Sequence, residues 1–139
     1  MITAVDTNVI VDVLRADATF GEPSAKALRA ALAEGRLVAC PVVWSELRAV
    51  FASDTALERA MAALRVEFDP LGAAASLVAG SAHRAYRRHG GKRTRTAPDF
   101  LVGGHASVSA DRLISRDRGY FRAYFAGLVV IDPSASPPV

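Results

Sequence analysis

The chain has 139 residues, of which 51% are hydrophobic and 22% charged, and its formal net charge is +3. This composition predicts one globular domain and excludes a disordered chain. A single cysteine, Cys40, excludes an internal disulfide and a zinc site built from cysteines, and its apolar surroundings predict a buried structural thiol. The N-terminus lacks a signal-peptide pattern and no apolar run reaches the ~18 residues that span a bilayer, so we expect a cytoplasmic protein.

Short apolar segments alternate with helical patterns along the chain. Residues 2–5 predict a buried strand, and residues 9–14 have helical spacing. Gly21 to Pro23 predicts a break, followed by a second helix that ends at Gly35. Further strands are predicted at 37–40, 66–68, 112–115 and 128–131, and further helices from Pro41, over 55–64, over 72–88 and from Thr96. The alternation predicts an α/β domain over residues 1–133 with a parallel sheet covered on both faces, and residues 134–139 as a flexible tail.

Four acids, Asp6, Glu46, Asp99 and Asp117, stand where a strand should end or in or near the start of a helix. In a parallel sheet such positions meet at one edge, so we expect one acidic pocket. Two carboxylates 4 Å apart repel by about 4 kcal/mol at an effective dielectric of about 20. Such a pocket therefore needs protons or a divalent cation, and oxygen ligands favour Mg²⁺ or Mn²⁺.

Each acid also has a structural interpretation. Asp6 and Asp117 are equally suited to turns or helix caps, and Asp99 lies in a first helical turn, where the helix dipole favours acids. Glu46 lies in an otherwise apolar helix, which predicts a carboxylate near buried surface that either pairs with Arg48 or serves a site. Asp12 is expected on solvated helix surface, although it is close to Asp6 in sequence.

Two glycines and a histidine mark the helix that contains Asp99. Gly103 and Gly104 each cost about 1 kcal/mol relative to alanine, which indicates that another group approaches this backbone closely. His105 is expected to be a hydrogen-bonded structural residue and not a ligand.

A basic segment lies near these acids in sequence. Residues 70–98 contain no Asp or Glu but six basic side chains, namely Arg84, Arg87, Arg88, Lys92, Arg93 and Arg95. This block suits a polyanion such as RNA, with Arg116 and Arg118 beside Asp117 as further phosphate contacts. The alternative is a solvated helix end, where cations are also favoured.

Four segments together resemble PIN-domain ribonucleases of the VapC toxin class: residues 5–9 (VDTNV), 45–47 (SEL), 98–102 (PDFLV), and 113–117 (LISRD) with Phe121 shortly after. They occur in the order of that family over residues 2 to about 131. The resemblance implies a PIN-like three-layer sandwich with a five-stranded parallel sheet between helices.

The resemblance also implies a Mg²⁺-dependent endoribonuclease, with Mn²⁺ as a substitute cation. Asp6, Asp99 and Asp117 would bind the metal, Glu46 would complete the catalytic set, and Asn8 and Ser115 would support it. The departure is Gly103-Gly104, where the family has small and apolar helix-forming residues. A non-catalytic RNA-binding or regulatory module on the same fold is the alternative.

The implied partners are RNA, a protein antitoxin that neutralises the toxin, and a second copy in a homodimer. Trp44 and Phe51 lie on a different side of their helix from Val43, Leu47 and Val50. This arrangement fits burial on two sides inside the fold equally well as an exposed surface on which an amphipathic antitoxin helix docks.

Overall fold

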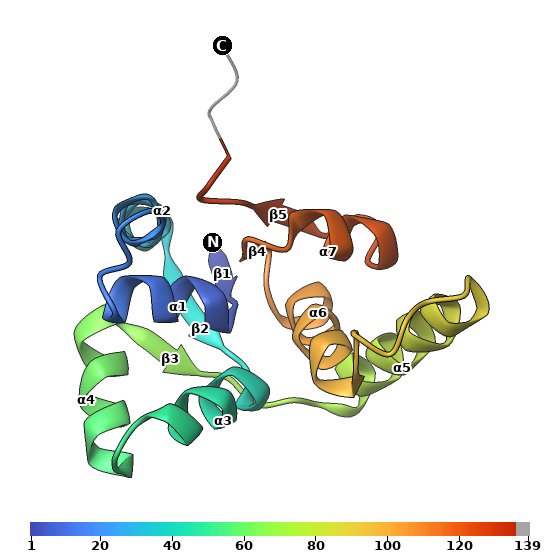
Figure 1. Cartoon of the computed structure of the whole chain (residues 1–139), viewed down its shortest axis with the longest axis horizontal. Helices are drawn as coiled ribbons and strands as arrows, with labels where there is room; N and C mark the ends of the chain where they lie inside the picture. Colours follow the sequence, from blue (N-terminus) through green and yellow to red (C-terminus); the bar gives the residue numbers. More distant parts are fainter. Residues whose placement is uncertain (136–139) are drawn as a thin grey trace.

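A five-stranded parallel sheet forms the centre of the computed structural model, which describes residues 1–135 (Figure 1). Its strand order is β3-β2-β1-β4-β5, and Ala4 in the central strand pairs with both Val38 and Leu113. The prediction of a five-stranded parallel sheet is therefore confirmed. The strands are β1 (Ile2–Val5), β2 (Arg36–Ala39), β3 (Val66–Phe68), β4 (Arg112–Ile114) and β5 (Val129–Ile131).

Helices flank this sheet. Figure 1 shows α1 to α4 gathered about the β2 and β3 half of the sheet and α5 to α7 about the β4 and β5 half. The bounds are α1 (Thr7–Leu14), α2 (Gly21–Glu34), α3 (Pro41–Val50), α4 (Asp54–Leu64), α5 (Ala73–Arg88), α6 (Ala97–Ser109) and α7 (Arg118–Tyr124). The break predicted at Gly21 to Pro23 is wrong, because α2 begins at Gly21. Pro23 falls in its first turn, where the missing N–H has no helical partner to lose.

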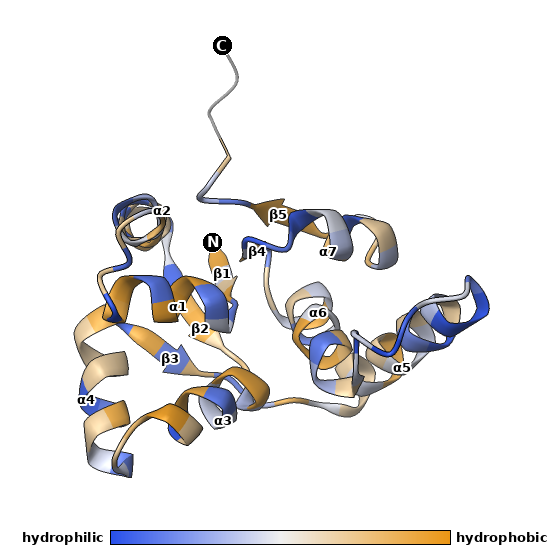
Figure 2. Cartoon of the chain, in the orientation of Figure 1, coloured by the Kyte–Doolittle hydropathy of each residue, from blue (hydrophilic) through white to orange (hydrophobic). Residues whose placement is uncertain are grey.

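The central strands are apolar because both faces of the sheet are covered there, whereas the edge strands β3 and β5 are partly exposed. Val5, Leu37, Leu113 and Ile114 are all buried. Figure 2 shows hydrophobic colour along β1 and β5 and hydrophilic colour at the end of α5. Cys40 is buried at the end of β2, as expected, and burial raises the pKa of its thiol. Fully covered strands need no alternation of polar and apolar residues, which explains the short continuous runs in the sequence.

The glycine pair of α6 allows two close contacts. A Cβ atom at Gly104 would lie 2.4 Å from the backbone oxygen of Ala75, and one at Gly103 would lie 2.3 Å from the ring of Phe125. The close approach predicted from the sequence is thus provided by α5 and by the residue after α7. The helix α6 is continuous through both glycines.

The histidine beside these glycines is structural, as expected. His105 is 1% exposed, and its Nε2 lies 2.7 Å from Oδ2 of Asp69, which follows β3. This contact joins α6 to the chain that leaves the sheet.

The apolar residues of α3 differ in how deeply they are buried. Val43 and Leu47 are buried, but Val50 is 60% exposed, because the last turn of α3 extends past the core. Trp44 is half-buried with its ring edge-on to Phe68, and Phe51 follows the helix in extended conformation. The helix therefore keeps an exposed apolar side chain at its C-terminal end.

Beyond β5, Ser134 donates hydrogen bonds to the carboxylate of Asp132 through both its backbone N–H and its hydroxyl. Residues 136–139 of the predicted tail lie outside the described residues, so the boundary at residue 133 stays a prediction. No helix among residues 1–135 is long and apolar enough to cross a membrane.

Candidate functional site

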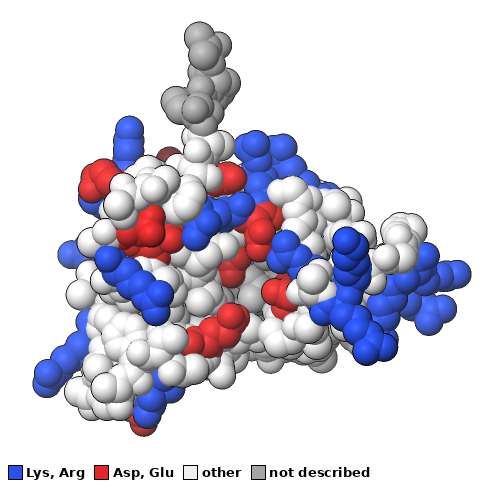
Figure 3. Space-filling view, in the orientation of Figure 1, with Lys and Arg blue, Asp and Glu red and all other residues white. Residues whose placement is uncertain are grey.

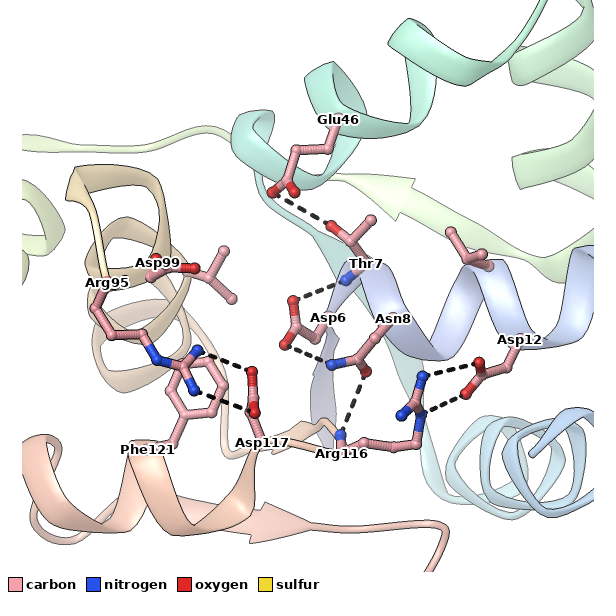
Figure 4. Close-up of a pocket in the computed structure, with 12 residues that line it drawn as sticks. Asp6, Thr7, Asn8, Asp12, Glu46, Arg95, Asp99, Arg116, Asp117 and Phe121 are labelled. Atoms are coloured by element: carbon pink, nitrogen blue, oxygen red, sulfur yellow. Dashed lines mark hydrogen bonds and ion pairs between the residues drawn. The ribbon is translucent and has the colours of Figure 1, made fainter. Parts of the chain in front are cut away.

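A cavity of about 330 Å³ opens at the carboxyl edge of the sheet, where β1 and β4 end side by side. All four predicted acids line it, and they come from four parts of the chain (Figure 4). Asp6 follows β1, Glu46 lies on α3, Asp99 lies in the first turn of α6, and Asp117 precedes α7. The structure therefore brings the four acids together at one edge of the sheet, as predicted from the sequence.

Ser115 connects two of these acids. Its hydroxyl, fully buried, donates to Oδ2 of Asp6 at 2.7 Å and accepts from the backbone N–H of Asp117 at 3.0 Å. The parallel ladder continues past the strand ends, because the N–H of Asp6 donates to the carbonyl of Ile114 at 3.0 Å. These bonds fix Asp6 relative to the turn that carries Asp117.

Asn8 and Thr7 complete the surroundings of Asp6. The amide of Asn8 donates to Oδ2 of Asp6 at 3.4 Å, and its oxygen accepts from the N–H of Arg116 at 3.3 Å. The N–H of Thr7 donates to Oδ1 of Asp6 at 2.8 Å. Burial raises the pKa of Asp6 to about 6, against the opposing effect of the hydrogen bonds from Ser115 and Thr7, and the charges of Asp117 and Glu46 add smaller increases.

Glu46 is exposed on α3, and Arg48 pairs with Asp54 at 2.6 Å and not with Glu46. Of the two alternatives considered for Glu46, the ion pair with Arg48 is therefore wrong. Val43 and Leu47 take the core-facing side of the helix, which leaves position 46 over the cavity. Its carboxylate accepts from the hydroxyl of Thr7 at 3.4 Å, and partial burial at the cavity raises its pKa.

Asp99 caps α6 and also faces the cavity. Its Oδ2 accepts from the backbone N–H of Thr96 at 2.8 Å in a capping box, and its side chain lines the cavity. A helix-capping bond engages only one of the two carboxylate oxygens, so the other is available to the cavity.

Asp117 is held by an arginine from a distant loop. The guanidinium of Arg95 donates to Oδ2 at 3.0 Å and to Oδ1 at 3.3 Å, and it lies 4.2 Å above the ring centre of Tyr120. The hydroxyl of Tyr120 is buried and has no hydrogen-bond partner within residues 1–135. Burial, reinforced by the charge of Asp99, raises the pKa of this phenol, which keeps it neutral beside the acids.

Asp12 is buried, so its predicted place on solvated helix surface was wrong. It is 5% exposed and accepts from the Arg116 guanidinium at 2.8 and 3.1 Å and from the hydroxyl of Ser24 at 3.2 Å. Arg116 also covers the ring of Phe20 at 4.1 Å. A buried carboxylate requires such a partner. The guanidinium that we expected to contact phosphate is thus engaged with α1.

The carboxylates do not form a closed metal cage in this conformation. Among residues 1–135, no three His, Cys, Asp or Glu side chains are arranged closely enough to hold an ion together. Each acid instead has a partner from the protein, and for Asp117 that partner takes both oxygens. The donor set of carboxylates in one cavity still has the chemistry that hard divalent cations prefer.

A second cavity, of about 730 Å³, adjoins the acidic one and is basic. Arg87, Lys92 and Arg93 line it, Arg95 lines both cavities, and Arg84 and Arg88 are exposed outside it. Arg118 is half-buried at the start of α7. Figure 3 shows acidic side chains across the middle of this face, and Lys and Arg side chains over the end of α5 and the loop that follows.

Two features of the site were missed from the sequence. The pairing of Arg95 with Asp117 depends on the path of residues 89–96, for which the sequence has no periodic signal. The burial of Asp12 had a signal, because Asn8 and Asp12 are four residues apart and lie on one face of α1. Asn8 was expected at the site, so Asp12 should have been expected next to it.

Comparison with known proteins places the fold. The PIN domain family model matches residues 3–126. No curated protein is significantly similar in sequence. A chain of VapBC2 from Rickettsia felis, in a complex bound to a DNA fragment from the promoter, is 15% identical with a TM-score of 0.74, over 94% of this chain and 98% of that one.

Two further solved structures are similar over nearly the whole chain. A chain of VapBC-1 from nontypeable Haemophilus influenzae is 24% identical with a TM-score of 0.71, over 97% and 100% of the two chains. A chain of FitAcB from Neisseria gonorrhoeae is 22% identical with a TM-score of 0.68, over 96% and 98%. At these identities the likeness shows a common fold, and the family-model match covers most of the sequence. The resemblance noted in the sequence is therefore confirmed, and the chain belongs to the PIN domain family.

Proposed function

We propose that the protein is a divalent-metal-dependent endoribonuclease that hydrolyses phosphodiester bonds of RNA, and that it is the toxin of a toxin–antitoxin pair. The observation that supports the activity is the convergence of Asp6, Glu46, Asp99 and Asp117 on one cavity. Membership of the PIN domain family and the likeness to VapBC structures support the assignment to a toxin.

Asp6, Asp99 and Asp117 would hold Mg²⁺ or Mn²⁺, with Glu46 as a further acid that lines the cavity. The cation would supply Lewis-acid stabilisation of the negative charge that develops on the phosphate oxygens and would make water a better nucleophile. Ser115 and Asn8 hold Asp6 in place through hydrogen bonds. Asp12 holds the guanidinium of Arg116. Glu46, with its raised pKa and its exposure to the cavity, is placed to accept a proton from water.

The basic cavity supports RNA as the substrate. Arg87, Lys92 and Arg93 lie next to the acids and offer sequence-independent phosphate contacts. A strand that crosses both cavities would present its backbone to these cations and one phosphate to the acids. The negative acids would bind a polyanion poorly unless a cation neutralised them, which is a second reason to propose a metal.

The test is cleavage of total RNA by purified protein with and without Mg²⁺. We expect EDTA to abolish cleavage and Mn²⁺ to restore it, and Asp99→Asn to be inactive by at least about 100-fold, a usual loss for a group that acts on the transition state. The amide retains an oxygen that can cap α6, so this variant should still melt cooperatively. Undiminished cleavage in EDTA would contradict the proposal, and RNA binding without cleavage would favour the non-catalytic alternative.

The partner proposal extends to an antitoxin and to a homodimer. An apolar groove of about 360 Å³ lies between α1, α3 and α4, lined by Leu14, Val50 and Phe51 among others. Its exposed apolar side chains support docking of an apolar segment of an antitoxin there. The same assay tests this: a bound antitoxin should suppress cleavage, and Val50→Lys should relieve the suppression. The homodimer stays a prediction, which light scattering of the purified protein would decide.

A further inference from the structure

Arg95 occupies a place between the two cavities. Its guanidinium meets both oxygens of Asp117, at 3.0 and 3.3 Å (Figure 4). It also rests on the face of the Tyr120 ring, 4.2 Å from the ring centre. It lines the acidic cavity on one side and the basic cavity on the other. The neighbouring cations Lys92 and Arg93 line only the basic cavity.

Of the three predicted metal ligands, Asp117 is the one whose two carboxylate oxygens are both bound by a cation, the guanidinium of Arg95. Asp6 and Asp99 accept hydrogen bonds from neutral groups, whereas Asp117 is neutralised by a full positive charge. A guanidinium that bridges both oxygens occupies the side of the carboxylate where a chelated divalent cation would bind, and its positive charge repels that cation. The absence of a three-ligand group among residues 1–135 agrees with Asp117 being held in this way.

We propose that Arg95 is an internal counter-ion of the acidic site, which competes with a divalent cation for Asp117 and, once released, binds a phosphate of the RNA. The inference rests on the proposed function, because it assumes that the acidic cavity binds metal. The ion pair is partly exposed, with 28% of the arginine and 42% of the aspartate side chain accessible. Such pairs are weak, so a divalent cation can displace the guanidinium.

The released guanidinium is well suited to phosphate. Its planar fork that now matches a carboxylate also matches two phosphate oxygens. The guanidinium of Arg95 rests on the ring of Tyr120, and Arg95 also lines the basic cavity. Metal and RNA would thus bind with positive coupling, since each removes one partner of the Arg95–Asp117 pair, and such coupling is reciprocal.

The first measurement is Mn²⁺ affinity by calorimetry, without RNA. Arg95→Met should bind Mn²⁺ about five- to tenfold more tightly than the wild type, at the lower end of usual coupling strengths. Arg93→Met is the matched control, because it removes the same charge from the same loop without a contact to Asp117. It should change the affinity less than about twofold. Arg95→Lys keeps the charge but cannot bridge both oxygens, and it should lie between the wild type and Arg95→Met.

The second measurement is RNA binding in EDTA, where no metal-dependent cleavage occurs. Arg95→Met should have little effect in the wild type, because Asp117 already holds the guanidinium. In the Asp117→Asn background the same substitution should weaken binding and lower the salt slope by about 0.7, the value for one contact on a single strand. The difference between the two backgrounds is the coupling energy of a double-mutant cycle.

The outcomes separate the two proposals. If the wild type and Arg95→Met do not bind Mn²⁺, or if Asp99→Asn leaves their Mn²⁺ binding unchanged, the proposed metal site itself is wrong. If the wild type binds Mn²⁺ through Asp99 but Arg95→Met and Arg93→Met change the affinity equally, only the counter-ion role is wrong. Equal losses of RNA affinity from Arg95→Met in both backgrounds would overturn the transfer of Arg95 to phosphate. Thermal melting establishes that each variant is folded.

Discussion

Ser115 shows how a small side chain organises a site of repelling charges. One buried hydroxyl donates to the carboxylate of Asp6 and accepts from the N–H of Asp117. The bond to Asp6 is charge-assisted and short, at 2.7 Å. Residues of this kind do not contact substrate, yet they determine how the acids present their free oxygens.

The raised pKa of Asp6 leads to a pH prediction for the metal-free protein. Burial, as the main cause, raises this pKa from 3.8 to about 6. Between these values the native state binds more protons than the unfolded state, so the free energy of unfolding should fall as pH rises through this window. Each unit of pKa difference corresponds to about 1.4 kcal/mol, so the decrease should not exceed a few kcal/mol.

Urea denaturation in EDTA at a series of pH values measures this effect. Asp6→Asn should remove this part of the pH dependence, although lost hydrogen bonds should shift its stability by an amount independent of pH. Glu58→Gln, which alters an exposed carboxylate on α4, is the control and should keep the wild-type slope. If Asp6→Asn and the wild type have parallel curves from pH 4 to 7, burial does not affect this carboxylate as described.

At the scale of elements, the packing of α5 on α6 positions Asp99. Gly104 allows the close approach, because a Cβ there would lie 2.4 Å from a backbone oxygen of α5, which cannot rotate away. Gly80, on α5, is exposed, and a Cβ there would meet nothing within 4 Å. A side chain is therefore excluded at Gly104 but has room at Gly80.

We expect Gly104→Ala to destabilise the protein by about 1–3 kcal/mol through overpacking. Gly80→Ala should stabilise it by up to about 1 kcal/mol, because alanine is the better helix former. Thermal or urea unfolding of the two variants measures both changes. A stable Gly104→Ala protein would mean that α5 can move away from α6 at little cost, and the place of Asp99 would then not depend on this contact.

The elements could be predicted largely because local patterns coincide with the fold. Most strands contain short apolar runs; Asp6 follows β1 directly, and Asp117 comes three residues after the end of β4. The helix α7 was missed because a helix of seven residues has too few turns for a periodic signal. The start of α2 was misplaced because Pro23 indicates a break in the sequence but is tolerated in a first turn.

The site could be predicted as a set of acids but not as a set of pairs. Which cation meets which carboxylate depends on loops: Arg95 reaches Asp117 from residues 89–96, and Arg116 turns towards Asp12. Glu46 was expected near buried surface because its neighbours are apolar, and helix geometry places it over the cavity without an ion pair to Arg48. The residue types therefore indicated an acidic site, whereas the pairing of each carboxylate depends on which residues lie next to it in the fold.

At the scale of the whole molecule, charge is divided between adjoining acidic and basic cavities. Lys92 and Arg93 line the basic cavity, whereas Arg84 and Arg88 lie outside it on α5. In EDTA, the variant Lys92→Met with Arg93→Met should bind single-stranded RNA more weakly, with a salt slope smaller by about 1.4, since each lost phosphate contact accounts for about 0.7.

The variant Arg84→Met with Arg88→Met is the matched control, because it removes the same net charge. Its salt slope should change by less than half as much. Binding titrations at several salt concentrations compare the two variants. Equal changes would mean that RNA responds to the total charge of α5 and its loop and does not enter the basic cavity.

The bond between Ser115 and Asp6 also has a consequence for synthesis of the protein. These residues are 109 positions apart, and β1 gains its second neighbour only when β4 is added to the sheet. A chain still growing on the ribosome therefore holds Asp6 long before it holds Ser115 and Asp117. Contacts over such distances form late, because closing a long loop precedes the gain from pairing. An incomplete chain that ends before β4 lacks the assembled acidic cavity, so premature termination would yield fragments without the candidate active site.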